Sequence, residues 1–220
     1  MRGKSIVVFP GNWKLCYNYC VDTLSKEYLV SFYDNTLRMH GDRPEALRWT
    51  SPGQMLHYEG LVDTDDVIAG RVLDYGCGKG DLYPFLRQKG YRIQYTGMDI
   101  NPGLIAKAKE KYPDTRFMVF DIEEDELTED FDYIFLCGVF NLKVEGIEET
   151  IKRVLRRLFK RCRKTLVFNG LSAHNPAQSY ELFYIYPETL VNFALSELSP
   201  SISLRHDILP YDFFLFINKL

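Results

Sequence analysis

The chain has 220 residues, a formal net charge of −3 at pH 7 and 46% hydrophobic residues. That length accommodates one domain with an appendage, and the composition is typical of a soluble globular protein. The small negative charge gives no global electrostatic reason to expect a nucleic-acid partner. The five cysteines and four histidines are dispersed, without a C-x-x-C pair. This dispersion argues against both a disulfide framework and a metal site.

The first residues do not read as a targeting segment. Their apolar run ends at Pro10 and Gly11 and is too short for a signal peptide. No apolar run elsewhere approaches the roughly 20 residues that span a bilayer. We therefore expect a cytoplasmic protein with no membrane segment. Cys16 and Cys20 share a helix face and are interpreted as a pair of small buried side chains.

Residues 1–67 are mostly helical in pattern, most clearly over 23–41 and 51–63. We expect them to form a helical cover on a domain that spans residues 68–220.

From Arg71 onward, short apolar runs alternate with helical patterns. This alternation predicts a parallel sheet with right-handed crossovers. Asn101 and Pro102 are typical of the first residues of a helix. The expected strands are 71–75, 91–99, 115–121, 131–138 and 164–170, and the expected helices are 81–90, 102–112 and 144–162.

The C-terminal part follows a different pattern. A helix expected over 187–198 precedes two strands, 201–208 and 211–220, which are separated only by Leu209 and Pro210. So short a link joins antiparallel strands. The fold class is therefore α/β, with a mostly parallel sheet that ends in an antiparallel C-terminal hairpin.

Three glycines, Gly76, Gly78 and Gly80, follow the first strand of this sheet. In open parallel sheets, ligands bind beyond the carboxyl ends of the strands. A dinucleotide fingerprint requires a small third residue, but Asp81 or Tyr83 stands there, depending on the register. A nicotinamide dinucleotide is therefore disfavoured.

The stretch from Asp74 to Gly80 instead resembles the first motif, D-x-G-x-G-x-G, of class I S-adenosylmethionine-dependent methyltransferases. The likeness is to small, bacterial-type members and covers residues 68–220. It implies a Rossmann-like, doubly wound, seven-stranded sheet. It also implies S-adenosyl-L-methionine as methyl donor, S-adenosyl-L-homocysteine as product, and no metal.

The resemblance also implies roles for individual residues. Asp99, at the end of the second strand, would accept the ribose hydroxyls, which a carboxylate does well. Asp121, at the end of the third strand, would contact the adenine amino group, and Ile122 the ring. Cys137 and Gly138 would lie between cofactor and substrate. The full expected cofactor set is Asp74, Gly76, Cys77, Gly78, Gly80, Asp99, Ile100, Asp121, Ile122, Cys137 and Gly138.

The substrate is less defined by the sequence. After the fourth strand, the chain lacks the Asn/Asp-Pro-Pro-Tyr/Phe motif that methyltransferases of exocyclic amines often carry. His174, in a long loop, and His206, in the hairpin, are the candidate bases, and each could instead be an ordinary loop or strand residue. The candidate pocket residues, which could equally be core or cap residues, are Trp49, Gln54, His57, Phe140, Asn141 and Tyr211.

The segment 151–164 contains eight Lys or Arg residues. We interpret them as the solvated face of a helix whose apolar side packs on the sheet. Nucleic acid is therefore an unlikely partner, and a small molecule is the expected one, for a monomer or homodimer. Two alternatives stay open: an RNA or protein methyltransferase that uses this basic helix, and an S-adenosylmethionine-binding protein without methyltransferase activity.

Overall fold

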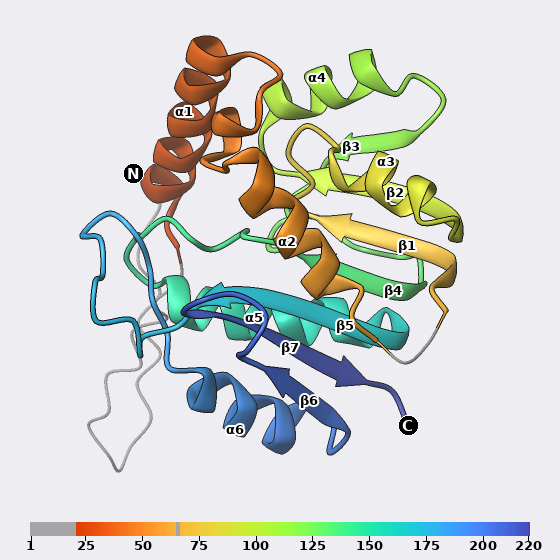
Figure 1. The fold of residues 1–220 in the computed structure, drawn as a ribbon, viewed down its shortest axis with the longest axis vertical. Coiled ribbons are helices and arrows are strands. Elements are labelled where there is room, and N and C mark those ends of the chain that lie inside the picture. Colours follow the sequence, from red (N-terminus) through yellow and green to blue (C-terminus); the bar gives the residue numbers. More distant parts are fainter. Residues whose placement is uncertain (1–20, 65–66) are drawn as a thin grey trace, which may run out of the picture.

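A computed structural model describes residues 21–64 and 67–220. Cys16, Cys20 and the apolar run that ends at Pro10 lie outside the described residues. Within the described residues, three elements precede the sheet (Figure 1): helix α1 (Thr23–His40), the 3-10 turn η1 (Pro44–Leu47) and helix α2 (Ser51–Leu61). The remaining helices are α3 (Leu82–Gln88), α4 (Pro102–Lys111), α5 (Ile147–Lys160) and α6 (Pro187–Glu197).

The sheet has seven strands in the order β3-β2-β1-β4-β5-β7-β6. The first five run parallel, and β7 pairs antiparallel with both β5 and β6. The predicted doubly wound sheet with a C-terminal antiparallel pair is confirmed. The strands are β1 (Ala69–Tyr75), β2 (Arg92–Asp99), β3 (Arg116–Val119), β4 (Phe131–Leu136), β5 (Cys162–Leu171), β6 (Ile202–Arg205) and β7 (Asp212–Asn218).

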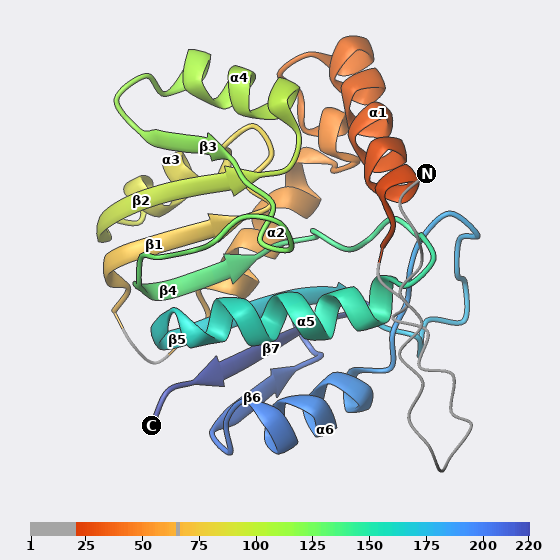
Figure 2. The ribbon, with the colours of Figure 1, turned by 180° about the vertical axis from the view of Figure 1, so that it is seen from behind.

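Helices cover both faces of the sheet because the central strands carry buried apolar side chains on both sides. One buried cluster joins the sheet to α2, α3 and α4, and it contains Leu61, Phe85 and Ile105. The other joins it to α5 and α6 and contains Leu155 and Phe193. Figure 1 looks at the α2 and α3 face, and Figure 2 at the α5 face.

The helix starts follow local capping rules. Asp22 accepts the amide of Ser25 at 2.8 Å at the start of α1. Thr50 accepts the amide of Gly53 at 3.2 Å at the start of α2. Asn101 accepts the amide of Leu104 at 2.8 Å, and this confirms the predicted cap of α4. In both views α1 lies beyond the carboxyl ends of the parallel strands (Figures 1 and 2).

Several predicted boundaries are shifted, and two of the shifts have a clear cause in strand pairing and link length. The basic helix ends at Lys160 rather than at residue 162, because Cys162 begins β5 and pairs with Phe131 of β4. The hairpin link is longer than Leu209 and Pro210, since β6 ends at Arg205 and β7 begins at Asp212.

Within the described ranges, no helix is long and apolar enough to span a membrane.

Candidate functional site

The glycine turn after β1 is held by its neighbour β2. The amides of Gly76 and Cys77 both donate to the carbonyl oxygen of Met98, at 2.7 and 3.0 Å. Gly76, Gly78 and Gly80 have φ values of +77°, +54° and +75°. Glycine adopts this left-handed backbone region without a steric cost, which explains the residue type.

Packing within the chain is a second reason for these glycines. A Cβ atom on Gly76 would lie 2.6 Å from Val139, and one on Gly78 would lie 2.8 Å from Leu47. Val139 and Leu47 both line the cavity that the turn borders, so the turn, the cover and the β4 end meet there.

Asp99, the last residue of β2, fixes the turn from the side. Its Oδ2 accepts the amide of Gly78 at 2.8 Å, and its Oδ1 accepts the amide of Asn101 at 2.8 Å. Burial raises the pKa of this carboxyl, whereas the two amide hydrogen bonds lower it. Each oxygen keeps a second lone pair. Asp99 therefore orders the turn and still presents acceptors to the cavity that it lines.

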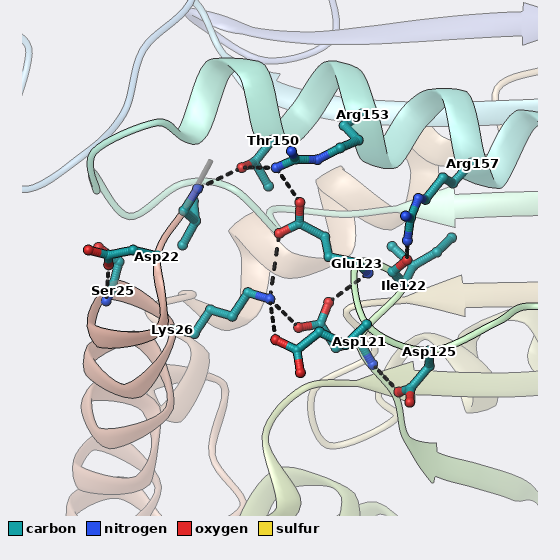
Figure 3. A network of polar contacts seen from close by, with 12 residues as sticks. Asp22, Ser25, Lys26, Asp121, Ile122, Glu123, Asp125, Thr150, Arg153 and Arg157 are labelled. Atoms are coloured by element: carbon teal, nitrogen blue, oxygen red, sulfur yellow. Dashed lines mark hydrogen bonds and ion pairs between the residues drawn. The ribbon is translucent and has the colours of Figure 1, made fainter. Parts of the chain in front are cut away.

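Asp121 lies two residues beyond β3, not at its last residue as predicted. Its Oδ2 accepts Lys26 Nζ of α1 at 2.6 Å, and its Oδ1 accepts the amide of Glu123 at 2.9 Å. Figure 3 shows these contacts between the α1 start and the loop after β3. The sequence prediction did not foresee that α1 reaches this carboxylate.

A cavity lies where α1 faces the ends of β1, β2, β3 and β4. Nine of the predicted site residues line it: Trp49, Gly76, Gly78, Asp99, Ile100, Asp121, Cys137, Gly138 and Phe140. Burial raises the pKa of the Cys137 thiol well above its usual range. These residues come from separate parts of the chain, and the fold brings them together.

The inner face of α1 was missed in the sequence analysis. Lys26, Leu29, Val30 and Tyr33 line the cavity. Their spacing of three to four residues is that of one helix face, a signal already present in the sequence. Burial, reinforced by the charge of Asp99, raises the pKa of Tyr33 to about 12.

Four predicted cofactor residues do not line the cavity: Asp74, Cys77, Gly80 and Ile122 are absent from its wall. The buried carboxylate of Asp74 accepts the hydroxyl of Tyr95. Burial raises its pKa to about 7, and the charges of Asp99 and Asp81 add to the rise, although the Tyr95 hydrogen bond lowers it. Asp74 therefore links β1 to β2 just before the turn.

Of the predicted α2 cover residues, neither Gln54 nor His57 lines the cavity. Gln54 Nε2 lies 3.4 Å from Asp81 Oδ2, and His57 binds Asp212 of β7. The His57 ring packs behind Trp49, with ring centroids 4.2 Å apart. Trp49 thus forms the wall, and α2 supports it from outside.

The remaining candidates lie away from the cavity wall. His174 is exposed and contacts Glu188 at 2.8 Å. His206 lies just after β6, with its ring centroid 6.2 Å from that of His174. Tyr211 is 43% exposed in the turn before β7. Asn141 follows Phe140 but is absent from the lining. A direct catalytic role for either histidine has no support from this geometry.

Several arginines of α5 bind within the chain. Arg156 pairs with Glu197 of α6 at 2.6 Å, and Arg157 donates to the carbonyl oxygen of Ile122. Arg153 pairs with Glu123 (Figure 3). The sequence interpretation was a solvated charged face, whereas these three arginines are tied to neighbouring elements. Among the described residues, no group of three or more His, Cys, Asp or Glu could hold a metal ion.

Comparison with known proteins gives consistent results. Residues 72–161 match the family described as "Methyltransferase domain". Rv1506c of Mycobacterium tuberculosis, provisionally named a methyltransferase, is 27% identical over 154 residues, which cover 67% of this chain and 92% of that protein. The malonyl-[acyl-carrier protein] O-methyltransferase of Acetivibrio thermocellus is 32% identical over 82 residues, 36% of this chain and only 29% of that enzyme.

Solved structures share the fold at low identity. The magnesium protoporphyrin IX methyltransferase ChlM of Synechocystis, crystallised with bound SAH, superposes with a TM-score of 0.65 at 15% identity. The alignment covers 90% of this chain and 99% of that one. The structural likeness therefore covers much more of the chain than residues 72–161, which the family match covers.

Proposed function

We propose that this protein transfers the methyl group of S-adenosylmethionine to an oxygen or nitrogen atom of a small-molecule acceptor. Its fold is that of class I methyltransferases, and residues 72–161 match a methyltransferase domain. The row of strand ends at the cavity carries this proposal. Neighbouring strands lie about 4.8 Å apart, so the ends of β1, β2 and β3 form an edge on which an extended ligand can lie.

The residues on this edge suit S-adenosylmethionine. The turn at Gly76 and Gly78 borders the cavity with backbone alone, which allows a close approach of the methionine part. Asp99, in the middle, offers carboxylate acceptors for the two ribose hydroxyls. Asp121, at the far end, offers an acceptor for the adenine amino group. The order of donors in the ligand thus matches the order of acceptors in the site.

S-adenosylmethionine supplies an activated methyl on a sulfonium, so the transfer is an in-line displacement that leaves S-adenosylhomocysteine. The protein then accelerates the reaction mainly by holding the acceptor atom near 3 Å from the methyl group and in line with the breaking bond. Trp49, Gly138 and Phe140 are placed to do this, since they line the cavity beside the glycine turn. Trp49 lies so close to Gly138 that a Cβ there would be 2.6 Å from its ring.

A small acceptor is favoured over a macromolecule by the character of the wall. Leu47, Trp49, Val139 and Phe140 give it an apolar and aromatic surface, as in pockets for small organic molecules. The relatives named for a carrier-bound malonyl group and for a magnesium porphyrin agree with an organic acceptor. The basic α5 gives weak support to RNA, because Arg153, Arg156 and Arg157 are engaged within the chain.

Calorimetric binding of S-adenosylhomocysteine tests the cofactor site. We expect micromolar binding by the wild type and at least tenfold weaker binding by Asp99→Asn, a loss of about 1.4 kcal/mol. Asp132→Asn is the matched control, because Asp132 also accepts a backbone amide, that of Arg71 at 2.8 Å, but does not line the cavity. Absence of binding by the wild type would overturn the proposal.

Transfer of a radiolabelled methyl group tests the acceptor class. The protein is incubated with methyl-labelled S-adenosylmethionine and cell extract, and the label is measured in small-molecule, RNA and protein fractions. We expect label in the small-molecule fraction and none with Asp99→Asn. Label in RNA or protein would favour the alternative of an RNA or protein methyltransferase, and binding without any transfer would favour a cofactor-binding protein.

The cytoplasmic location and the domain boundary between residues 67 and 68 stay predictions.

A further inference from the structure

Lys26 joins the first turn of α1 to the acidic loop after β3. Its ammonium group lies 2.6 Å from Asp121, 3.0 Å from Glu124 and 3.7 Å from Glu123 (Figure 3). The side chain of Lys26 is 20% exposed and that of Asp121 is 19% exposed. An ion pair with so little exposure is screened less than one in open water. Although burial lowers the pKa of Lys26, its hydrogen bonds to Asp121 and Glu124 raise it overall.

The same end of α1 is also attached to α5. The amide of Val21 donates to Thr150 Oγ1 at 3.0 Å, a buried contact. Arg153 pairs with Glu123, which also faces Lys26 (Figure 3). The start of α1, the loop after β3 and the first half of α5 therefore form one connected network. Val21, Lys26, Glu123 and Thr150 all line the cavity.

This network lies at the end of the cavity that Asp121 marks, opposite the glycine turn. We propose that Lys26 is a positioning residue of the cofactor site: it fixes the Asp121 carboxylate and the start of α1 over the adenine end. The inference rests on the proposed function, because it concerns the same cofactor. It assigns to α1 a role that the glycine turn and Asp99 do not have, namely to retain the ligand once bound.

Two features of the geometry make this role specific to Lys26. Its three carboxylate partners all belong to the loop after β3. The contact therefore joins α1 to that loop and does not stabilise a single helix only. Moreover, Lys26 and Asp121 both face the cavity, whereas Lys107 of α4 pairs with Glu110 of its own helix and does not line it. Lys107→Met is therefore a matched control.

The attachment of α1 by the Lys26 contact is measured first, without ligand, by amide hydrogen exchange. In Lys26→Met, we expect amides of the first two turns of α1 to exchange at least tenfold faster than in the wild type. In Lys107→Met, those amides should exchange at the wild-type rate. Unchanged exchange in Lys26→Met would refute the attachment of α1 by this contact, whether or not the protein binds S-adenosylhomocysteine.

The consequence for the cofactor is measured by stopped-flow dissociation of S-adenosylhomocysteine. We expect dissociation from Lys26→Met to be at least tenfold faster, and from Lys26→Arg to be close to the wild-type rate. Raising the salt from 0.05 to 0.5 M should speed dissociation from the wild type but not from Lys26→Met, because only the former has this ion pair to screen. Equal rates in the wild type and Lys26→Met would overturn the inference and leave the proposed function intact.

Discussion

His57 of α2 and Asp212 of β7 form a buried hydrogen-bonded pair across 155 positions of sequence. The other ring nitrogen of His57, Nδ1, lies 2.7 Å from the carbonyl oxygen of Gly53. A carbonyl oxygen only accepts, so Nδ1 is the donor in that contact, and Nε2 faces the carboxylate. The pair attaches α2 to the sheet directly behind Trp49, which lines the cavity.

We expect His57→Phe to lower the free energy of unfolding by about 3 kcal/mol, because it leaves the Asp212 carboxylate without its partner. The two side chains are only 10% and 12% exposed, so water does not replace the lost contact. Chemical unfolding measures the loss. His174→Phe is the control, since it removes a contact with Glu188 that is exposed, and we expect a change below about 0.5 kcal/mol.

A double substitution distinguishes a paired charge from simple packing. His57→Phe combined with Asp212→Leu replaces both partners with apolar groups, and this should cost less than His57→Phe alone. Losses that simply add would contradict the pairing.

Lys79, within the glycine turn, is fully buried. It donates to the carbonyl oxygens of Asp42 and Arg43 at 2.8 and 3.1 Å, and it pairs with Asp81 at 3.0 Å. We expect Lys79→Met to cost about 2 kcal/mol or more, because two carbonyl groups lose a charged donor. The loss should appear first as faster hydrogen exchange between Gly41 and Arg48.

Lys89→Met is the matched control for Lys79, because Lys89 pairs with Glu59 at 2.7 Å while 38% exposed. A stability loss in Lys89→Met equal to that in Lys79→Met would show that burial of the ammonium group contributes nothing. If amides of residues 41–48 in Lys79→Met exchanged at the wild-type rate, Lys79 would not be needed to hold this segment against the glycine turn.

Local signals made the sheet and part of the site predictable from sequence. The glycine turn, the Asn101 cap and Asp99 at a strand end each depend on residues near them in the chain. The hairpin strands were also readable, but their ends were not, since pairing with β5 decides where β7 begins. Likewise, Cys162 belongs to β5 because Phe131 pairs with it, although the charge pattern continued the helix.

Contacts between distant segments explain what the sequence did not reveal. Lys26 finds Asp121 across 95 positions, and Lys79 finds Asp42 across 37. A lysine in a glycine-rich turn looks solvated by composition alone, and only the packing of η1 against the turn buries it. In the same way, His57 was a candidate pocket residue in the sequence, but Trp49 occupies the cavity wall in front of it.

Two glycines with positive φ allow the cost of backbone strain to be measured apart from the cost of overpacking. Gly80 and Gly90 have φ values of +75° and +80°. A Cβ on Gly80 would lie 2.6 Å from Phe117, whereas one on Gly90 would meet nothing within 4 Å. We expect Gly90→Ala to cost about 1 kcal/mol from the left-handed backbone. Gly80→Ala should cost about 3 kcal/mol, since overpacking is added.

The same two variants report on the turn as a binding element. Gly80→Ala should weaken S-adenosylhomocysteine binding by at least tenfold, because Phe117 or the turn must shift, and Gly90→Ala should bind like the wild type. Calorimetry and chemical unfolding measure the two effects. Equal stability losses in Gly80→Ala and Gly90→Ala would mean that Phe117 yields without cost.

Asp74 makes the stability of the protein depend on pH in a defined direction. Burial raises its pKa in the folded protein to about 7, above the ordinary 3.8 of the unfolded chain. Between these values the folded state binds the proton and the unfolded state does not. The contribution of Asp74 to stability therefore falls as the pH rises through this window, and the penalty is complete above about pH 7.

Asp74→Asn removes this titration and keeps an oxygen that accepts the Tyr95 hydroxyl. We expect the free energy of unfolding of the variant, relative to the wild type, to be higher at pH 8 than at pH 5 by at least about 1 kcal/mol. Urea unfolding of both proteins at the two pH values measures this difference. In Tyr95→Phe the stability should fall further between these two pH values than in the wild type, because the Tyr95 hydrogen bond lowers the pKa of Asp74. The same relative stability of Asp74→Asn at both pH values would mean that Asp74 stays ionised in its buried position.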